Sequence, residues 1–260
     1  MKLRVLRADP AGNITLFVLD PVEREQRPQV AARLMAMPAL HADQVGFLCP
    51  PAAGGDGRLE MMGGEFCGNA TRALGLLMAK NRGDVTSVRL EVSGCHHLVT
   101  VDTDPAAGTA RAEMPLPLEV RRETVDGHEG TLVNLGGIVH LVTEDAAPAM
   151  EFFQKAEPLL KSVPGPEAYG VIFLDREKDA MTPLVKVPAT DTLVWEGSCG
   201  SGSLAAAVAQ SQGAPDGVFQ RCYRQPAGVI EATVVREDGK VTAAYIGGPV
   251  SLEEPVTLQL

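Results

Sequence analysis

Two cysteines, each followed by a glycine and a run of small residues, are the residues of this chain best suited to chemistry. Cys67 opens the segment CGNATRALG, and Cys199 opens CGSGSLAAAVA, 132 residues further along. A helix that begins directly after a cysteine points unpaired backbone N–H groups toward the sulfur, and such groups bind anions and favour a thiolate. Each segment therefore predicts a helix N-terminus that places a thiol beside a carboxylate site.

A matched pair of thiols predicts proton transfer at one carbon atom from its two faces. A thiolate on one face would remove the α-proton of an amino acid, and a thiol on the other would deliver a proton, which inverts the configuration. The two groups exchange roles in the reverse reaction, so the two sites should be alike. A lone cysteine is more often a small buried apolar residue, so it is the pairing of the motifs that points to catalysis.

The other cysteines, Cys49, Cys95 and Cys222, lack this flanking pattern, and we interpret them as structural. The sequence contains no CxxC pair and no close cluster of cysteine and histidine, so we expect no metal site. His96 and His97 lie in a strand-like stretch, where we expect an exposed or packed pair rather than metal ligands.

Composition excludes several classes of partner. The formal net charge of −10 argues against nucleic acid, which is bound through clustered Lys and Arg. No signal-peptide pattern opens the sequence, and no apolar run is long enough to span a membrane. We therefore expect a cytoplasmic protein with a small-molecule substrate and no membrane partner, with a homodimer as a further possibility. Hydrophobic residues make up 45% and aromatic residues 4%, which predicts a core of small aliphatic side chains.

The predicted elements repeat in two halves, each with strands, a helix, strands, a Cys-Gly helix and further strands. The helical stretches span 22–37, 67–84, 148–163 and 199–213. This repeat indicates a duplication with approximate two-fold symmetry, in which the two helix starts face one cleft. A proline-flanked hinge near 116 divides the chain into 1–116, with a strand returning at about 250–260, and 117–249. In the helix from 67, Leu74, Leu77 and Met78 are spaced for one buried face, and the helix should stop at Arg82-Gly83.

At these residues the sequence resembles the diaminopimelate epimerase superfamily of amino-acid racemases that need no pyridoxal phosphate. The resemblance covers essentially the whole chain and is carried by AGN at 11–13, Gln44, CGNATR at 67–72 and CGSG at 199–202. It implies an α+β fold of two similar domains, each a barrel-like, mainly antiparallel sheet around a central helix, and no cofactor.

The resemblance also implies a role for each matching residue. Cys67 and Cys199 correspond to the two acid/base thiols. The residues that correspond to the carboxylate-binding helix starts are Gly68, Asn69, Gly200 and Ser201. The positions that correspond to substrate contacts are Asn13 and Gln44.

Three departures separate the chain from diaminopimelate epimerases. CGNA stands in place of CGNG, GGIVH at 136–140 replaces GNPH, and no Glu-Arg pair precedes the second thiol. The chain is more similar to the histidine racemase branch of opine-metallophore biosynthesis, through GGEFCGNAT, VSGC at 92–95, LVWEGSCGSG and QPAG at 225–228. The expected reaction is conversion of L-histidine to D-histidine, with diaminopimelate or another amino acid as the alternative. Glu65 and Glu196 are candidates for binding a substrate ammonium or imidazole, with surface or capping roles as the alternative.

Two other classes of function compete with this one. A thiol redox protein would need the two cysteines within about 7 Å between Cα atoms, and the lack of CxxC argues against it. A carboxylate-binding module without catalysis would not need two matched thiols.

Overall fold

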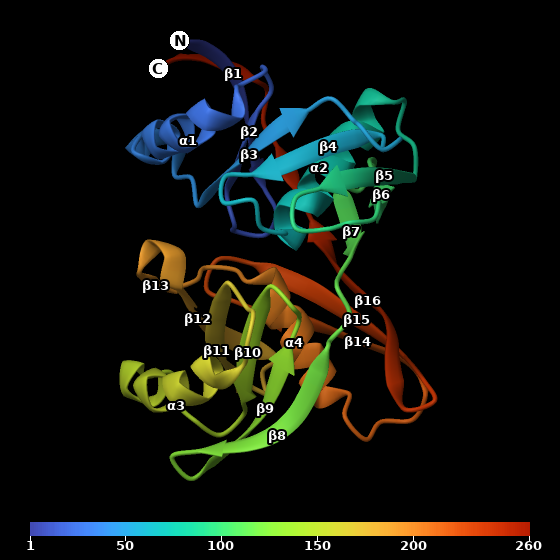
Figure 1. Ribbon diagram of the computed structural model, residues 1–260. Coiled ribbons are helices and arrows are strands. Elements are labelled where there is room, and N and C mark those ends of the chain that lie inside the picture. The colour runs from blue at the N-terminus through green and yellow to red at the C-terminus, as the bar shows by residue number, and fades with distance from the viewer. The chain divides into compact units, whose positions relative to one another are not determined.

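The computed structural model describes residues 1–260, except for the side chain of Thr190. The chain forms two compact units, one made of Met1–Glu113 with Gly247–Leu260 and the other of Met114–Ile246. The chain leaves the first unit and returns to it at residue 247, and Figure 1 shows the returning red segment beside the blue strand β1.

The first unit is a mainly antiparallel sheet with two helices. Its strands are β1 (Lys2–Asp9), β2 (Thr15–Val18), β3 (Gln44–Cys49), β4 (Gly57–Met61), β5 (Ser87–Val92), β6 (Val99–Asp104), β7 (Thr109–Glu113), β17 (Ser251–Leu252) and β18 (Val256–Gln259). Its helices are α1 (Arg27–Met35) and α2 (Gly68–Asn81), with 3-10 turns at Arg24–Gln26 and Pro38–Leu40. Strand β1 pairs with β2 on one side and with β17 and β18 on the other.

The second unit has the same kinds of element. Its strands are β8 (Glu119–Val125), β9 (His128–Asn134), β10 (Ile138–Thr143), β11 (Ala168–Asp175), β12 (Ala180–Val187), β13 (Thr192–Trp195), β14 (Gly217–Arg224) and β15 (Val229–Glu237). Its helices are α3 (Met150–Ser162) and α4 (Gly200–Gln210), with a 3-10 turn at Pro188–Thr190. Strand β16 (Lys240–Pro249) begins in this unit and ends in the first.

The order of strand pairing repeats between the units. In the first, α1 connects the parallel pair β2 and β3, and α2 connects the parallel pair β4 and β5. In the second, α3 connects the parallel pair β10 and β11, and α4 lies between β12 and β14, which also pair in parallel. At the same point in the order of elements, an antiparallel pair joins β3 to β4 in the first unit and β11 to β12 in the second. The predicted α+β architecture with a repeated order of elements is confirmed.

The second helix of each unit lies inside its sheet, whereas the first lies against one face. Helix α2 packs against β4, β5, β6 and β7, and α4 packs against β9, β10, β14 and β15. Figure 1 shows α4 among the strands of its unit, with α3 to one side of them. The two central helices therefore carry their N-terminal residues on buried, well-packed supports.

Helix α2 begins after an extended residue and ends at a left-handed glycine. Cys67 is the N-cap, with φ −125° and ψ 107°, and Gly83 follows the C-cap with φ +84°, a conformation that glycine adopts without strain. The predicted stop at Arg82-Gly83 is confirmed. The single predicted buried face is wrong, because Leu76 is fully buried while Leu77 is only partly buried. A helix enclosed by strands buries more than one face.

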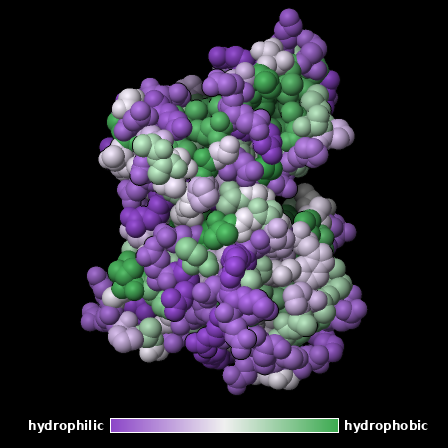
Figure 2. Space-filling view, turned by 180° about the vertical axis from the view of Figure 1, so that it is seen from behind, coloured by the Kyte–Doolittle hydropathy of each residue, from purple (hydrophilic) through white to green (hydrophobic). Residues whose placement is uncertain are grey.

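Charged and polar residues dominate the surface, as the composition predicts. Figure 2 shows one face on which hydrophilic residues predominate and apolar residues form patches between them. Exposed large apolar side chains include Leu118, Val218 and Trp195, all in the second unit. Among the described residues, no helix is long and apolar enough to cross a membrane.

Candidate active site

Cys67 caps helix α2 with its sulfur. The Sγ atom accepts a hydrogen bond from the backbone N–H of Ala70 at 3.4 Å. The Cys67 carbonyl accepts from the backbone N–H of Thr71 at 2.9 Å and from the Thr71 hydroxyl at 2.7 Å. These bonds fix the cysteine backbone at the helix start and turn the sulfur toward the free N–H groups of the first turn.

Cys199 caps helix α4 in the same way. Its φ and ψ are −120° and 110°, close to those of Cys67. Its Sγ accepts from the backbone N–H of Gly202 at 3.3 Å, and its carbonyl accepts from the Ser203 hydroxyl at 2.7 Å. A side chain at Gly202 would lie 2.6 Å from Ile172 Cδ1 and 3.1 Å from the sulfur, so the residues around the thiol pack closely here. The two cysteines thus occupy equivalent helix N-caps.

The predicted residues of the first unit gather around Cys67. The Gln44 amide donates to Asn13 Oδ1 at 2.7 Å and to Thr15 Oγ1 at 2.8 Å. The same amide lies near the Cys67 sulfur and lowers the pKa of that thiol, against the larger effect of burial. Asn69 is almost fully buried, and its side-chain oxygen accepts from Arg72 Nε at 3.2 Å.

The predicted residues of the second unit gather around Cys199. Ser201 Oγ lies 3.5 Å from Cys199 Sγ and 2.9 Å from Nε2 of His140, a buried residue of β10. Glu196 lies close enough to the Cys199 thiol to accept its hydrogen bond, which raises the pKa of the thiol. The set of Glu196, Cys199, Gly200 and Ser201 is therefore one local cluster at the start of α4.

Two loops, VSGC at 92–95 and QPAG at 225–228, hold the segments that lead into the two cysteines. In VSGC, the Ser93 hydroxyl donates to the Glu65 carbonyl at 2.7 Å, and it accepts from the backbone N–H of Met61 at 2.9 Å. In QPAG, Gln225 Oε1 accepts from the backbone N–H of Cys199 at 2.6 Å, and its Nε2 donates to Ser203 Oγ at 2.9 Å.

These loops follow corresponding strands, β5 and β14. Ser93 and Gln225 were missed as functional positions because each acts on residues more than twenty positions away. The sequence signal that could have identified them is that VSGC and QPAG both resemble segments of the histidine racemase branch.

Burial decides the charge state of both thiols. Desolvation raises the pKa of Cys67, and the N–H of Ala70 and the Gln44 amide offset it only in part. Desolvation raises the pKa of Cys199 well above its usual range, and Glu196 raises it further. The N–H groups of the helix start favour the thiolate, as expected, but their contribution is smaller than that of desolvation. Both groups rest as thiols at neutral pH, and each becomes a strong base once deprotonated.

The other titratable candidates do not form a site. Cys222 is exposed on β14, and Cys49 and Cys95 are partly buried. His96 and His97 are exposed and precede β6, which begins at Val99 rather than at the histidines. Within the described residues, no group of His, Cys, Asp and Glu could hold a metal ion.

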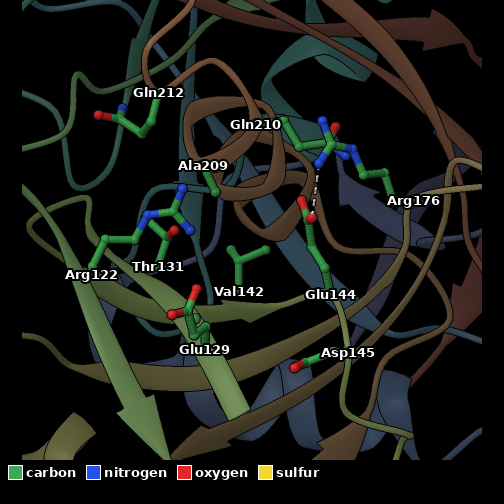
Figure 3. Close-up of a pocket in the computed structure, with 11 residues that line it drawn as sticks. Arg122, Glu129, Thr131, Val142, Glu144, Asp145, Arg176, Ala209, Gln210 and Gln212 are labelled. Atoms are coloured by element: carbon green, nitrogen blue, oxygen red, sulfur yellow. Dashed lines mark hydrogen bonds and ion pairs between the residues drawn. The ribbon is translucent and has the colours of Figure 1, made fainter.

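A polar hollow in the second unit lies at the other end of α4. Figure 3 shows Arg176 and Glu144 forming an ion pair at 3.5 Å beside it, with Ala209 and Gln210 on its wall. Gln210 ends α4 and Cys199 precedes its first residue, so the two are separated by the length of the helix, about 16 Å. This hollow therefore belongs to a different part of the unit from the Cys199 cluster.

A family model described as the histidine racemase CntK N-terminal domain matches residues 2–254. The chain belongs to this histidine racemase family. It is 28% identical over 269 residues to a histidine racemase of Fusobacterium nucleatum subsp. nucleatum. The alignment covers 96% of this chain and 94% of the relative. It is 26% identical over 274 residues to a diaminopimelate epimerase of Magnetococcus marinus, covering 94% and 90%.

A solved structure extends the fold comparison. The phenazine biosynthesis protein of the PhzF family from Bacillus anthracis superposes with a TM-score of 0.72 over 100% of both chains, at 13% identity, and shows the shared fold. With the family model and the curated relatives, the histidine racemase family membership makes the chain an isomerase of the racemase and epimerase class.

Proposed function

We propose that the chain interconverts L-histidine and D-histidine, with Cys67 and Cys199 as the two proton carriers of one active site. The observation that carries the proposal is the equivalence of the two half-sites. Each cysteine caps a buried helix, with its sulfur bonded to the N–H three residues on and its carbonyl bonded to the hydroxyl four residues on. The family model and the Fusobacterium relative support histidine as the substrate.

The chemistry follows from the resting state of the thiols. One of them loses its proton to solvent water as substrate binds, and the resulting thiolate removes the α-proton, while the other thiol delivers its proton to the opposite face. A base with a raised pKa suits this step, because an α-proton is a weak acid. The free N–H groups at the starts of α2 and α4 would bind the substrate carboxylate and stabilise the charge that spreads onto it.

The remaining predicted residues take supporting roles in this proposal. Gln44, held by Asn13, stabilises the Cys67 thiolate and borders the substrate. Glu196 lies beside Cys199 and is the acidic group that would bind the substrate ammonium or imidazolium. Glu65, two residues before Cys67, lies near enough to that thiol to raise its pKa and is the acidic group on the side of the first unit.

The test is exchange of the α-proton in deuterium oxide without pyridoxal phosphate. Purified protein should incorporate deuterium into L-histidine and D-histidine and bring either isomer to zero optical rotation. Cys67→Ser and Cys199→Ser should each reduce turnover by at least ~100-fold, since general acid–base groups contribute roughly 10²–10⁴-fold. Cys222→Ser, at an exposed cysteine, is the matched control and should keep full activity.

Two results would change the assignment. Exchange with diaminopimelate but not with histidine would retain the thiol chemistry and replace the substrate. Full turnover in either the Cys67 or the Cys199 variant would end the two-thiol scheme, whatever the substrate.

A further inference from the structure

Three polar groups in the second unit form a continuous chain from the Cys199 thiol into the protein interior. Cys199 Sγ lies 3.5 Å from Ser201 Oγ, and Ser201 Oγ lies 2.9 Å from His140 Nε2. His140 has no exposed surface. The histidine is 61 residues from Ser201 in sequence, so their contact at the start of α4 is a tertiary one set by the fold.

The other ring nitrogen of His140, Nδ1, lies in a closely packed environment. His140 lies on β10 opposite Gly170 of β11, and a side chain at Gly170 would approach Nδ1 to 3.3 Å. Nδ1 is buried and has no hydrogen-bond partner among the described residues. Burial lowers the pKa of His140 to about 3, so the ring is neutral at physiological pH. The ring therefore carries one proton, on either Nδ1 or Nε2.

The unpartnered nitrogen selects the tautomer. A proton on Nδ1 would bury an N–H donor without an acceptor, and orphaned N–H groups are the rarer kind of buried unsatisfied group in proteins. A proton on Nε2 instead donates to Ser201 Oγ and leaves Nδ1 as a bare acceptor. Ser201 Oγ then accepts from the histidine, and its own single proton is directed to the remaining neighbour, Cys199 Sγ.

We propose that His140 is a positioning residue that holds the Ser201 hydroxyl as a hydrogen-bond donor to Cys199 Sγ. The proposal rests on the function proposed above, because it concerns the stage at which Cys199 is a thiolate. The other groups that face this sulfur are the N–H of Gly202, which also donates to it, and the Glu196 carboxylate, which favours the thiol. Ser201 and His140 thus offset Glu196 and burial when the proton leaves.

The described residues around Cys67 do not repeat the Cys199–Ser201–His140 contacts of the second unit. The position equivalent to Ser201 is Asn69, whose side-chain oxygen is occupied by Arg72. The side chain that lowers the pKa of Cys67 is that of Gln44, which comes from β3 and donates hydrogen bonds to Asn13 and Thr15. Cys67 is therefore an internal control for any change made at Ser201 or His140.

The experiment measures the alkylation rate of each thiol against pH, in the full chain and without substrate. Iodoacetamide labelling of the Cys67 and Cys199 peptides is followed separately by mass spectrometry. Ser201→Ala and His140→Phe should each raise the midpoint of the Cys199 curve by roughly one to two pH units, the effect of losing one hydrogen bond to the charged form. The Cys67 curve should not move. His140→Gln keeps an amide donor, so its Cys199 midpoint should stay close to that of the unchanged protein. In a Ser201→Ala background, His140→Phe should cause no additional shift of the Cys199 midpoint.

Three outcomes would overturn the proposal. They are an unchanged Cys199 midpoint in Ser201→Ala, an equal shift of both thiols, and a full effect of His140→Phe in the absence of the Ser201 hydroxyl. Ser201→Ala removes a single partly buried hydroxyl at the start of α4, and the protein should tolerate this change. It therefore tests the proposal even if the His140 variants do not fold. Because no substrate is present, a shift confined to Cys199 stands even where histidine turnover fails, which separates this result from that of the proposed function.

Discussion

Thr71 and Ser203 make the same hydrogen bond in different units: each hydroxyl donates to the carbonyl oxygen of the cysteine four residues earlier, at 2.7 Å in both cases. A backbone carbonyl at a helix start already accepts the first helical N–H, so the hydroxyl is an additional bond that holds the cysteine in place. The repetition extends the equivalence of the half-sites from the sulfur atoms to their supports.

Replacing Gln225 should weaken the Cys199 site more than the fold. Gln225→Ala removes the acceptor of the Cys199 N–H and the donor to Ser203, so we expect about 1–2 kcal/mol less stability. Displacement of the thiol should lower kcat by ~10–100-fold. Steady-state racemisation kinetics and urea unfolding measure the two effects. Gln220→Ala, at an exposed position of β14, is the control, and a kcat equal to that of the control would contradict the role given to Gln225.

Arg72 should be among the most costly positions to replace in the first unit. Its guanidinium is fully buried and donates to the carbonyls of Gly248 and Pro249 at 3.1 and 3.0 Å. Arg72→Leu removes the guanidinium donor from both carbonyls, which should cost about 2–5 kcal/mol of unfolding free energy. Arg33→Ala, on the exposed side of α1, should change stability by less than about 0.5 kcal/mol. Equal denaturant midpoints for the two variants would refute this expectation.

Gly75 should be intolerant of a single methyl group although it lies in a helix. A Cβ at this position would overlap the side chain of Val101. Gly75→Ala should therefore destabilise the protein by about 1–3 kcal/mol, despite a gain of about 1 kcal/mol in helix propensity. Combining it with Val101→Ala should recover at least about 1 kcal/mol relative to the sum of the single changes. The same combination with Val45→Ala, in a separate core cluster, should be additive in chemical denaturation.

His140 should make the protein sensitive to acid. Burial lowers the pKa of His140 to about 3, against about 6.5 for the unfolded chain. The unfolded chain binds the proton more tightly, so the contribution of His140 is complete above about pH 6.5 and is lost as the pH falls toward 3. The loss is at most about 5 kcal/mol. Urea unfolding between pH 7 and pH 4 should show a flatter dependence for His140→Gln than for the control His96→Gln, which changes an exposed histidine. Parallel curves would mean that His140 is charged or accessible in the folded protein.

The local parts of the site could be predicted from the sequence, whereas the long-range parts could not. The thiols at helix starts, the end of α2 at Gly83 and the repeated order of elements depend on neighbouring residues and on period, which a sequence displays directly. The contacts of Ser201 with His140 and of Cys199 with Gln225 join positions on different strands and helices. Nothing in the local pattern marks such partners.

Burial decides one question that the sequence leaves open and corrects one expectation. The helix starts favour thiolates, but desolvation of the sulfurs is the larger effect and raises the pKa of both thiols. The spacing of Leu74, Leu77 and Met78 suggests one buried face, whereas α2 is surrounded and buries Leu76 as well. In both cases, the deciding quantity is how many strands enclose the helix, and that is a property of the assembled unit.

Strand β1 has a consequence for the order in which the protein can fold. One edge of β1 pairs with β2, but its other edge pairs with β17 and β18, in the register Lys2 to Gln259. While the ribosome is still synthesising residues 1–250, this second edge has no partner and can attract other strands. The first unit to emerge is therefore the last to be completed, because its sheet closes only when β17 and β18 have been made.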